Sequence, residues 1–192
     1  MNVRYLMSFK PLTEGELKKS QFTLSQTFPG RYLYENPNVL PRFFFVRGVV
    51  PSRGRDESLE LINREEWDPA RVAVVEGIDS AKQGLADGTV EVEKYANQEV
   101  ILRVRTAGES FLSSSEVNYP GWAAHIDGMT APIHYSNVAF RGIFVPAGDH
   151  RIVFRFRPAP LMSGAILTLL TAISLSVGIY WSERNPRRVA WK

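Results

Sequence analysis

The sequence predicts a mainly β fold: an antiparallel β-sandwich or jelly-roll-like domain with one or two short helices, followed by a single C-terminal transmembrane α-helix. Three observations predict it. Apolar and polar residues alternate along many segments of the first 160 residues, as expected of half-buried strands. Turn residues separate these segments about every 8–12 residues. An uncharged run, Leu161–Trp181, then follows near the end of the chain.

The strands are recognised by their period of two. Arg151–Arg157, "RIVFRFR", and Val100–Arg105, "VILRVR", alternate apolar residues with arginines, so one face of each is expected to be buried. Thr89–Tyr95 follows the same pattern and should turn Val90 and Val92 inward. Further strands are expected at Val3–Met7, Tyr32–Tyr34, Phe43–Val46, Val72–Val75, Phe111–Val117, Trp122–Ile126 and Phe140–Val145.

Turn residues indicate how the strands connect. The pairs Asp87-Gly88 and Asp127-Gly128 are typical of tight hairpins, because glycine adopts a positive φ at little cost. The segment Pro146–His150, "PAGDH", is expected to join the last two strands.

One clear helix interrupts the strands. Asp56–Trp67 has acidic residues in its first turn, where they favour the helix dipole. Leu59 and Ile62 are expected to share its apolar face, and the Asp-Pro pair that follows ends it. A second short helix is expected within Leu12–Ser25.

The uncharged run predicts a membrane span. Leu161–Trp181 contains 21 residues, about 31 Å as a helix, which matches the hydrocarbon thickness of a bilayer. Tyr180 and Trp181 close it where an interfacial aromatic belt would lie. The alternative is a buried core helix. The Tyr-Trp ending and the arginines beyond it favour a membrane span over that alternative. We therefore expect a β-domain over residues 1–158, a membrane helix over 159–182 and a basic tail over 183–192.

The charges indicate the partners of the chain and its orientation. Residues 1–160 carry 19 basic and 19 acidic side chains, so the net charge of +3 comes from the tail. A neutral body argues against binding to nucleic acid, and a basic tail suits anionic lipid. The basic tail also favours a single-pass protein of the cell membrane with a cytoplasmic tail and an extracytoplasmic domain.

The N-terminus conflicts with that orientation, because "MNVRYLMSFK" lacks the apolar region of a signal peptide. Two explanations stay open. The body is cytoplasmic and anchored by its tail, or the chain is the C-terminal piece of a longer membrane protein.

Catalytic motifs are not evident. The chain has no cysteine, which excludes disulfides and thiolate chemistry. It contains no nucleophile-elbow, phosphate-loop or zinc-protease motif. If Asp127-Gly128 is a two-residue turn, His134 lies opposite Gly121, and His125 is too far away to share a metal with it. We therefore expect no catalytic residue, no metal and no cofactor.

The stretch "YPGWAAHIDG" leaves two interpretations open. Trp122 begins a strand and shares a face with apolar residues, which favours a buried corner. A tryptophan beside a turn is also typical of a sugar-stacking platform. The candidate carbohydrate-binding residues are Tyr119, Trp122, Tyr135, Asn137 and Arg141.

Two longer stretches carry a resemblance to a known family. "YENPNVLPRFFFV" and "YPGWAAHIDGMTAPIHYSNVAFRGIFVPAGDHRIVFRFRP", followed by the apolar run, resemble the C-terminal region of YfhO-type bacterial membrane proteins. Those multi-span proteins resemble GT-C glycosyltransferases. The resemblance covers nearly the whole chain. It implies a β-sandwich outside the cytoplasmic membrane, the last transmembrane helix, and a catalytic region in spans that this chain does not contain.

The resemblance implies a non-catalytic domain that serves a glycosyltransferase acting on cell-envelope polymers. The expected partners are the lipid bilayer, other membrane spans or glycosyltransferase subunits, and an envelope glycan. An autonomous membrane-anchored carbohydrate-binding module and a tail-anchored cytoplasmic interaction protein are the alternatives.

Overall fold

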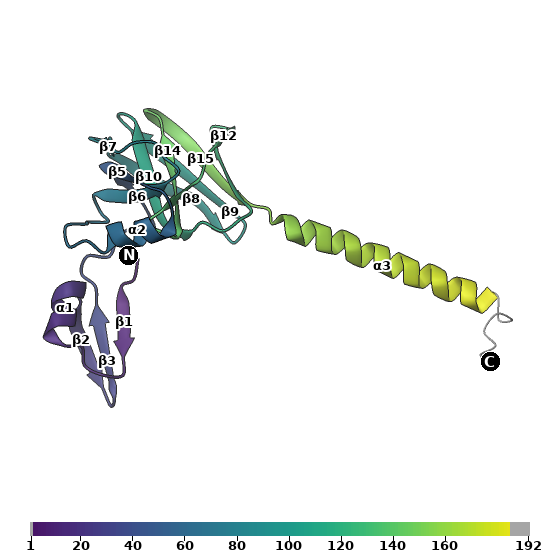
Figure 1. The fold of residues 1–192 in the computed structure, drawn as a ribbon, viewed down its shortest axis with the longest axis horizontal. Coiled ribbons are helices and arrows are strands. Elements are labelled where there is room, and N and C mark those ends of the chain that lie inside the picture. The colour runs from purple at the N-terminus through teal and green to yellow at the C-terminus, as the bar shows by residue number, and fades with distance from the viewer. Residues whose placement is uncertain (1, 185–192) are drawn as a thin grey trace.

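The computed structural model describes residues 2–184 (Figure 1). Its main body is a two-sheet β-domain. A small N-terminal lobe projects from this body, and a long helix, α3 (Ala159–Arg184), extends away from it. The mainly β architecture with few helices is therefore confirmed. Most of the predicted tail, 183–192, lies outside the described residues, which end at Arg184.

The larger sheet has seven strands. In spatial order they are β4 (Phe43–Val46), β10 (Ser110–Val117), β14 (Phe140–Val145), β13 (His134–Ser136), β6 (Val72–Glu76), β5 (Gly48–Ser52) and β7 (Lys82–Gln83). The pairing is antiparallel except between β5 and β6, which α2 (Arg55–Ile62) connects as a crossover helix. A helical crossover is the usual way to join two parallel neighbours.

The second sheet has five strands. In spatial order they are β12 (Met129–Ala131), β11 (Trp122–Ile126), β15 (Gly148–Phe156), β9 (Glu99–Thr106) and β8 (Gly88–Ala96). All its pairs are antiparallel. Since β15 lies between β11 and β9, the strand that continues into α3 is held on both sides.

The N-terminal lobe is a three-stranded antiparallel sheet with one helix. Its strands are β1 (Tyr5–Ser8), β3 (Arg31–Glu35) and β2 (Thr23–Phe28), and its helix is α1 (Glu14–Ser20). Thr13 and Glu16 form a capping box that begins α1. The buried Tyr34 hydroxyl accepts a hydrogen bond from the Leu12 backbone N–H at 2.8 Å, so this tyrosine joins the sheet to the segment before the helix.

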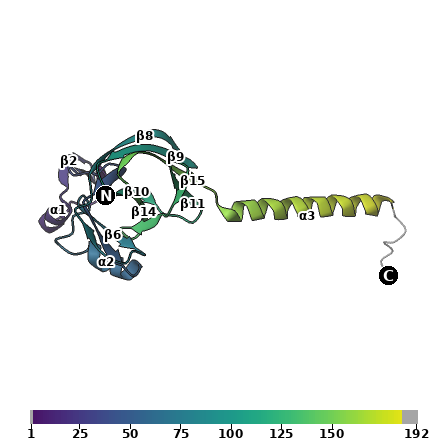
Figure 2. The same ribbon diagram turned by 90° about the horizontal axis from the view of Figure 1, so that it is seen from above.

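The two main sheets curve around a common interior (Figure 2), which apolar side chains fill. The seven-stranded sheet contributes residues such as Phe45, Leu112 and Ile143, and the five-stranded sheet contributes residues such as Leu102 and Phe154. A second cluster, around Val49, Val75 and Phe111, lies outside this core. Each cluster draws on alternate residues of the strands, as expected when a sheet is covered on both faces.

Several expectations about alternation hold. Val100, Leu102 and Val104 are buried along β9, and Ile152 and Phe154 are buried along β15. The predicted strands Phe43–Val46, Trp122–Ile126 and Phe140–Val145 have the observed bounds.

Val92 is an exception, because it is exposed. The register of β8 against β9 shifts between Val92 and Lys94, and such a bulge ends the simple alternation.

Two predictions about turns differ in outcome. Asp127 and Gly128 have φ values of 49° and 86° and connect β11 to β12, so the hairpin there is confirmed. Asp87-Gly88 is not a hairpin turn. Gly88 is instead the first residue of β8 and pairs with Thr106.

His134 does not lie opposite Gly121 as predicted. The strand β12 ends at Ala131, and the chain then crosses to the other sheet, where His134 pairs with Gly142. The separate strands β2, β5 and β7 were not predicted from the sequence. The strand β5 contains a proline and β7 has only two residues, while β2 overlaps the segment where a short helix was expected.

The helix predicted over Asp56–Trp67 is shorter than expected. It ends at Ile62 and buries Ser58, while Leu59 is exposed. The Ser58 hydroxyl donates to the Ser52 hydroxyl at 2.8 Å, so a polar contact lies where an apolar face was predicted. The later Trp67 indole donates to the Val72 carbonyl at 3.1 Å and holds the return into β6.

The C-terminal helix has the length and composition of a membrane span. Ser163–Arg184 contains 22 residues and is long and apolar enough to cross a bilayer, and none of this segment is buried against the domain. The hydroxyl of Thr168 donates to the Gly164 carbonyl at 2.9 Å, and Thr171, Ser174 and Ser176 each donate four residues back in the same way. Their polar groups are thereby satisfied within the helix.

Candidate functional site

Polar and aromatic residues gather at the end of the sandwich where β15 leaves for α3. We call this the junction end. Five of its residues are in contact and form what we call the junction cluster: Arg42, Tyr95, Glu116, Trp122 and Arg141. They come from strand ends that are far apart in the sequence, which the two-sheet fold brings together.

Glu116 is the centre of the junction cluster. Its carboxylate accepts hydrogen bonds from the Arg42 guanidinium at 2.6 Å and from the Tyr95 hydroxyl at 2.7 Å. Arg141 donates to the other carboxylate oxygen at 3.4 Å. Arg42 also lies over the Tyr95 ring, 4.8 Å from its centroid. The Glu116 carboxylate thus forms ion pairs with both Arg42 and Arg141, and its contact with Arg42 is the shorter.

Arg141 is the most unusual member because its side chain is only 1% exposed. Its guanidinium carbon lies 3.8 Å from the Trp122 ring centroid and 5.2 Å from that of Phe154. Among the described residues, its Nε and Nη1 have no hydrogen-bond partner. Burial lowers the pKa of Arg141 from its usual value, and the charge of Glu116 opposes this. The aromatic faces therefore supply much of the stabilisation that hydrogen bonds do not.

Trp122 and Tyr119 lie beside the start of α3. Their rings are tilted against that of Phe156, with centroid distances of 5.2 Å and 6.3 Å. Trp122 is half-buried and packs against the main core, as the corner interpretation predicts. Tyr119 is 62% exposed, so it presents a free aromatic surface at the junction end.

The other two predicted residues have different surroundings. Tyr135 is 40% exposed and pairs with Arg141 across β13 and β14, so the two side chains share a face. Asn137 has a φ of 49°. Its side-chain oxygen accepts a hydrogen bond from the Val74 backbone N–H at 2.8 Å, and its backbone N–H donates to the Val74 carbonyl at 2.7 Å.

The five candidate carbohydrate-binding residues are therefore only partly brought together. Trp122 contacts Arg141, and Tyr135 lies opposite Arg141, but the guanidinium is buried and Asn137 closes a loop. Sequence reasoning missed Arg42, Tyr95 and Glu116. Their contacts join residues 74, 21 and 25 positions apart, and no local pattern signals such pairs.

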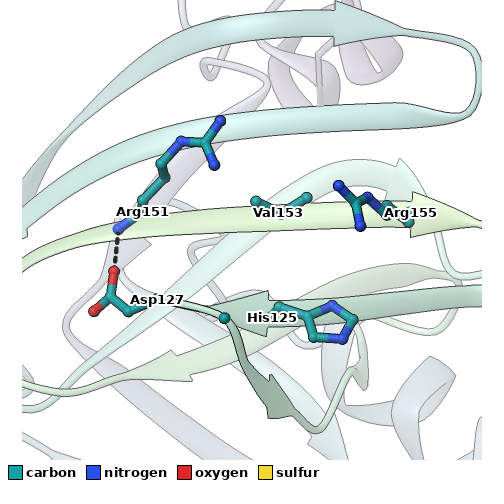
Figure 3. Close-up of a pocket in the computed structure, with 6 residues that line it drawn as sticks. His125, Asp127, Arg151, Val153 and Arg155 are labelled. Carbon is teal, nitrogen blue, oxygen red and sulfur yellow. Dashed lines mark hydrogen bonds between the residues drawn. The ribbon is translucent and has the colours of Figure 1, made fainter.

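A shallow groove lies on the outer face of the five-stranded sheet (Figure 3). It encloses about 560 Å³ and is lined by His125, Asp127, Gly128, Arg151, Val153 and Arg155. The two arginines are already paired, Arg151 with Glu93 at 3.0 Å and Arg155 with Glu99 at 2.9 Å. Each arginine of the groove is therefore held by a carboxylate of the same sheet.

His150 is held at one end of the same sheet. Its Nδ1 lies 2.6 Å from an Asp127 carboxylate oxygen, and its Nε2 lies 3.2 Å from the Ala147 carbonyl. The hydrogen bond to Asp127 raises the pKa of His150, and the contact with Ala147 acts in the same direction. Because both neighbours are acceptors, the protonated ring fits this position best.

A second groove, of about 340 Å³, lies beside Trp67 between α2 and the seven-stranded sheet. Arg64, Glu66, Asp68 and Arg71 line it, so its lining carries charges of both signs. No group of three or more His, Cys, Asp or Glu residues within residues 2–184 could hold a metal ion.

Comparison of the chain with protein-family models, with curated proteins and with solved structures finds no match in any of the three.

Proposed function

We propose that this chain is a non-catalytic, membrane-anchored β-domain that works outside the cytoplasmic membrane. In this proposal it is the C-terminal part of a GT-C-like glycosyltransferase system for cell-envelope polymers, as its resemblance to YfhO-type proteins implies. Its role is to shape the acceptor side of the enzyme or to dock partner subunits.

The observation that carries the proposal is the direct connection between the domain and its helix. The last strand, β15, ends at Phe156, and α3 begins at Ala159. The connection is also fastened, because the Arg157 N–H donates to the Gly121 carbonyl at 2.7 Å. So short a connection keeps the domain next to the membrane surface, which suits an accessory domain of a membrane enzyme.

The surface chemistry also suits a scaffold. Arg103 and Arg151 share Glu93, while Lys94 and Arg155 share Glu99. These exposed ion pairs form a ladder across the five-stranded sheet. Each of the two carboxylates is held by two cations, so neither is free to act as a general base in this part of the chain.

A genetic experiment tests the proposed role. In the source organism, loss of this chain should reduce the incorporation of labelled sugar into envelope polymers, and restoring it should recover incorporation. Restoring the domain without α3 should not recover it, because the domain would no longer be held at the membrane. Unchanged incorporation after loss of the chain would contradict the proposal.

Orientation is tested separately with single cysteines, since the natural sequence has none. Ala107→Cys lies in an exposed turn of the domain, and Ser182→Cys lies at the far end of α3. An impermeant maleimide added to intact cells should label the first and not the second. The reverse pattern would favour the tail-anchored cytoplasmic alternative.

The exposed ring of Tyr119 favours a second candidate, a membrane-anchored carbohydrate-binding module. Aromatic faces that are free at a surface can stack on sugars, and Trp122 lies close by. Titration of the full chain in detergent with envelope oligosaccharides tests this. Saturable binding that is lost in Tyr119→Ala would support the carbohydrate-binding module. An absence of binding would contradict the module and leave the scaffold role as the proposal.

A further inference from the structure

Two loops flank the polypeptide where it leaves the sandwich. One is the two-residue turn Asn97-Gln98 between β8 and β9, and the other is the turn Tyr119–Gly121 before β11. We call these two loops the junction collar. They lie on opposite sides of the exit strand, because β15 is placed between β9 and β11 in the sheet.

Main-chain hydrogen bonds fasten both loops to the exit strand. The Phe156 N–H donates to the Gln98 carbonyl at 2.9 Å, and the Arg157 N–H donates to the Gly121 carbonyl at 2.7 Å. Gly121 has a φ of 111°, and a Cβ at this residue would lie 3.1 Å from the Pro158 Cα. The glycine thus lets the turn approach the chain closely at the last residue before the helix.

The distance from the junction collar to the apolar segment is short. The helix begins at Ala159 and the candidate span begins at Ser163, so about 6 Å of helix separate them. The headgroup region on each side of a bilayer is about 5–7 Å thick. If α3 crosses a membrane, the collar must therefore lie within or against the headgroup layer.

The exposed chemistry of the collar fits that layer. Tyr119 presents an exposed ring, and Asn97 and Gln98 present exposed amides. Arg157 is also exposed and makes no ion pair with another described residue. Tyrosine is enriched at membrane interfaces, and arginine can contact lipid phosphates there.

We propose that the junction collar, Asn97-Gln98 and Tyr119–Gly121, docks into the phospholipid headgroup layer of the bilayer that α3 crosses. This inference rests on the proposed membrane anchoring. It goes further by assigning which end of the domain faces the lipid. Contacts on both sides of the exit strand then limit how far the domain can swing about its short connection.

The test uses the full chain in phospholipid nanodiscs with an environment-sensitive fluorophore on single cysteines. Asn97→Cys and Pro120→Cys report on the two loops of the collar. Ala107→Cys is the matched control, because it lies in the turn that follows β9 at the opposite end from Asn97. Over the eight residues of β9 that end is roughly 25 Å away. Ser174→Cys reports on the middle of α3.

Nitroxide groups on the lipid headgroup should quench both collar labels several-fold more strongly than the Ala107 label. Nitroxides deep in the acyl chains should quench the Ser174 label. If only the Ser174 label is quenched, the anchor holds and the collar proposal is overturned. If the Ser174 label is not quenched by acyl-chain nitroxide, the anchor itself fails, and the collar proposal fails with it.

Discussion

The guanidinium of Arg141 lies 3.8 Å from the centroid of the Trp122 ring, within the sandwich. One side of the indole is therefore covered by a buried cation. Its neighbour Phe156 is tilted against the same ring at 5.2 Å. This arrangement supports the interpretation of Trp122 as a packed corner at the end of the domain.

Replacement of Trp122 tests the corner. Trp122→Ala should lower the free energy of unfolding by about 3 kcal/mol, since a large ring is lost and Arg141 loses its aromatic contact. Tyr119→Ala, at an exposed position in the same turn, should change it by less than about 0.5 kcal/mol. Thermal unfolding in detergent measures both. A Trp122→Ala protein that keeps its stability but loses sugar binding would instead identify a platform.

Glu116 is predicted to matter through the charge that it balances. Glu116→Gln removes the carboxylate opposite Arg141 and leaves a buried cation uncompensated, so stability should fall by about 2–3 kcal/mol. In Glu116→Gln combined with Arg141→Met, most of that loss should be recovered, because the buried charge is gone. Chemical denaturation of the natural protein, of Glu116→Gln, of Arg141→Met and of the double variant gives the coupling energy between the two residues. Additive effects of the two substitutions would contradict the proposed dependence.

The contact between His150 and Asp127 predicts a dependence on pH. The hydrogen bond to Asp127 raises the pKa of His150 above its usual value of 6.5, so its contribution to stability is fully present below about pH 6.5. It is lost as the pH rises through the folded-state pKa. The pKa of Asp127 is lowered by the same hydrogen bond, and next by the Arg151 backbone N–H, so its contribution is lost in acid. Maximal stabilisation by this pair is therefore expected between about pH 4 and pH 6.5.

Asp127→Asn is the matched control for this pH effect. Asparagine tolerates the positive φ of 49° at residue 127 and can still accept from the Arg151 N–H. The turn should therefore persist while the charge is lost. Between pH 5.5 and 8.5, unfolding free energies should decline less in the variant than in the natural protein. Equal declines would show that another group titrates.

Gly88 is predicted to be needed for close packing between the sheets. A Cβ there would lie 2.4 Å from the Arg105 carbonyl oxygen and 2.7 Å from the Phe45 ring. Gly88→Ala should therefore destabilise the domain by about 1–3 kcal/mol. At Gly108 the nearest atom would be 3.3 Å away, on the Ala86 side chain, so Gly108→Ala serves as the milder control. Equal denaturation midpoints for the two variants would contradict this explanation.

Local patterns were sufficient for much of the fold. Alternation identified four strands of the five-stranded sheet, β8, β9, β11 and β15, and Asp127-Gly128 formed the predicted hairpin, because these features depend on neighbours in the sequence. Asp87-Gly88 has the same composition, yet Gly88 begins a strand. The glycine is required there by Phe45, which is distant in the sequence.

The junction cluster shows why the candidate site was only partly predictable. Tyr119 and Trp122 were recognisable because aromatic residues beside a turn stand out. The burial of Arg141 and its contact with Glu116 follow from the meeting of β10, β11 and β14 at one end of the sandwich. A single sequence contains no signal for that meeting.

The membrane anchoring of α3 is tested most directly by alkaline carbonate extraction of membranes from cells that make the full chain. We predict that the protein stays in the membrane pellet and is released only by detergent, because Ser163–Arg184 presents its apolar side chains outward. Release by carbonate alone, giving a monomer that stays dispersed in detergent-free buffer, would contradict the account.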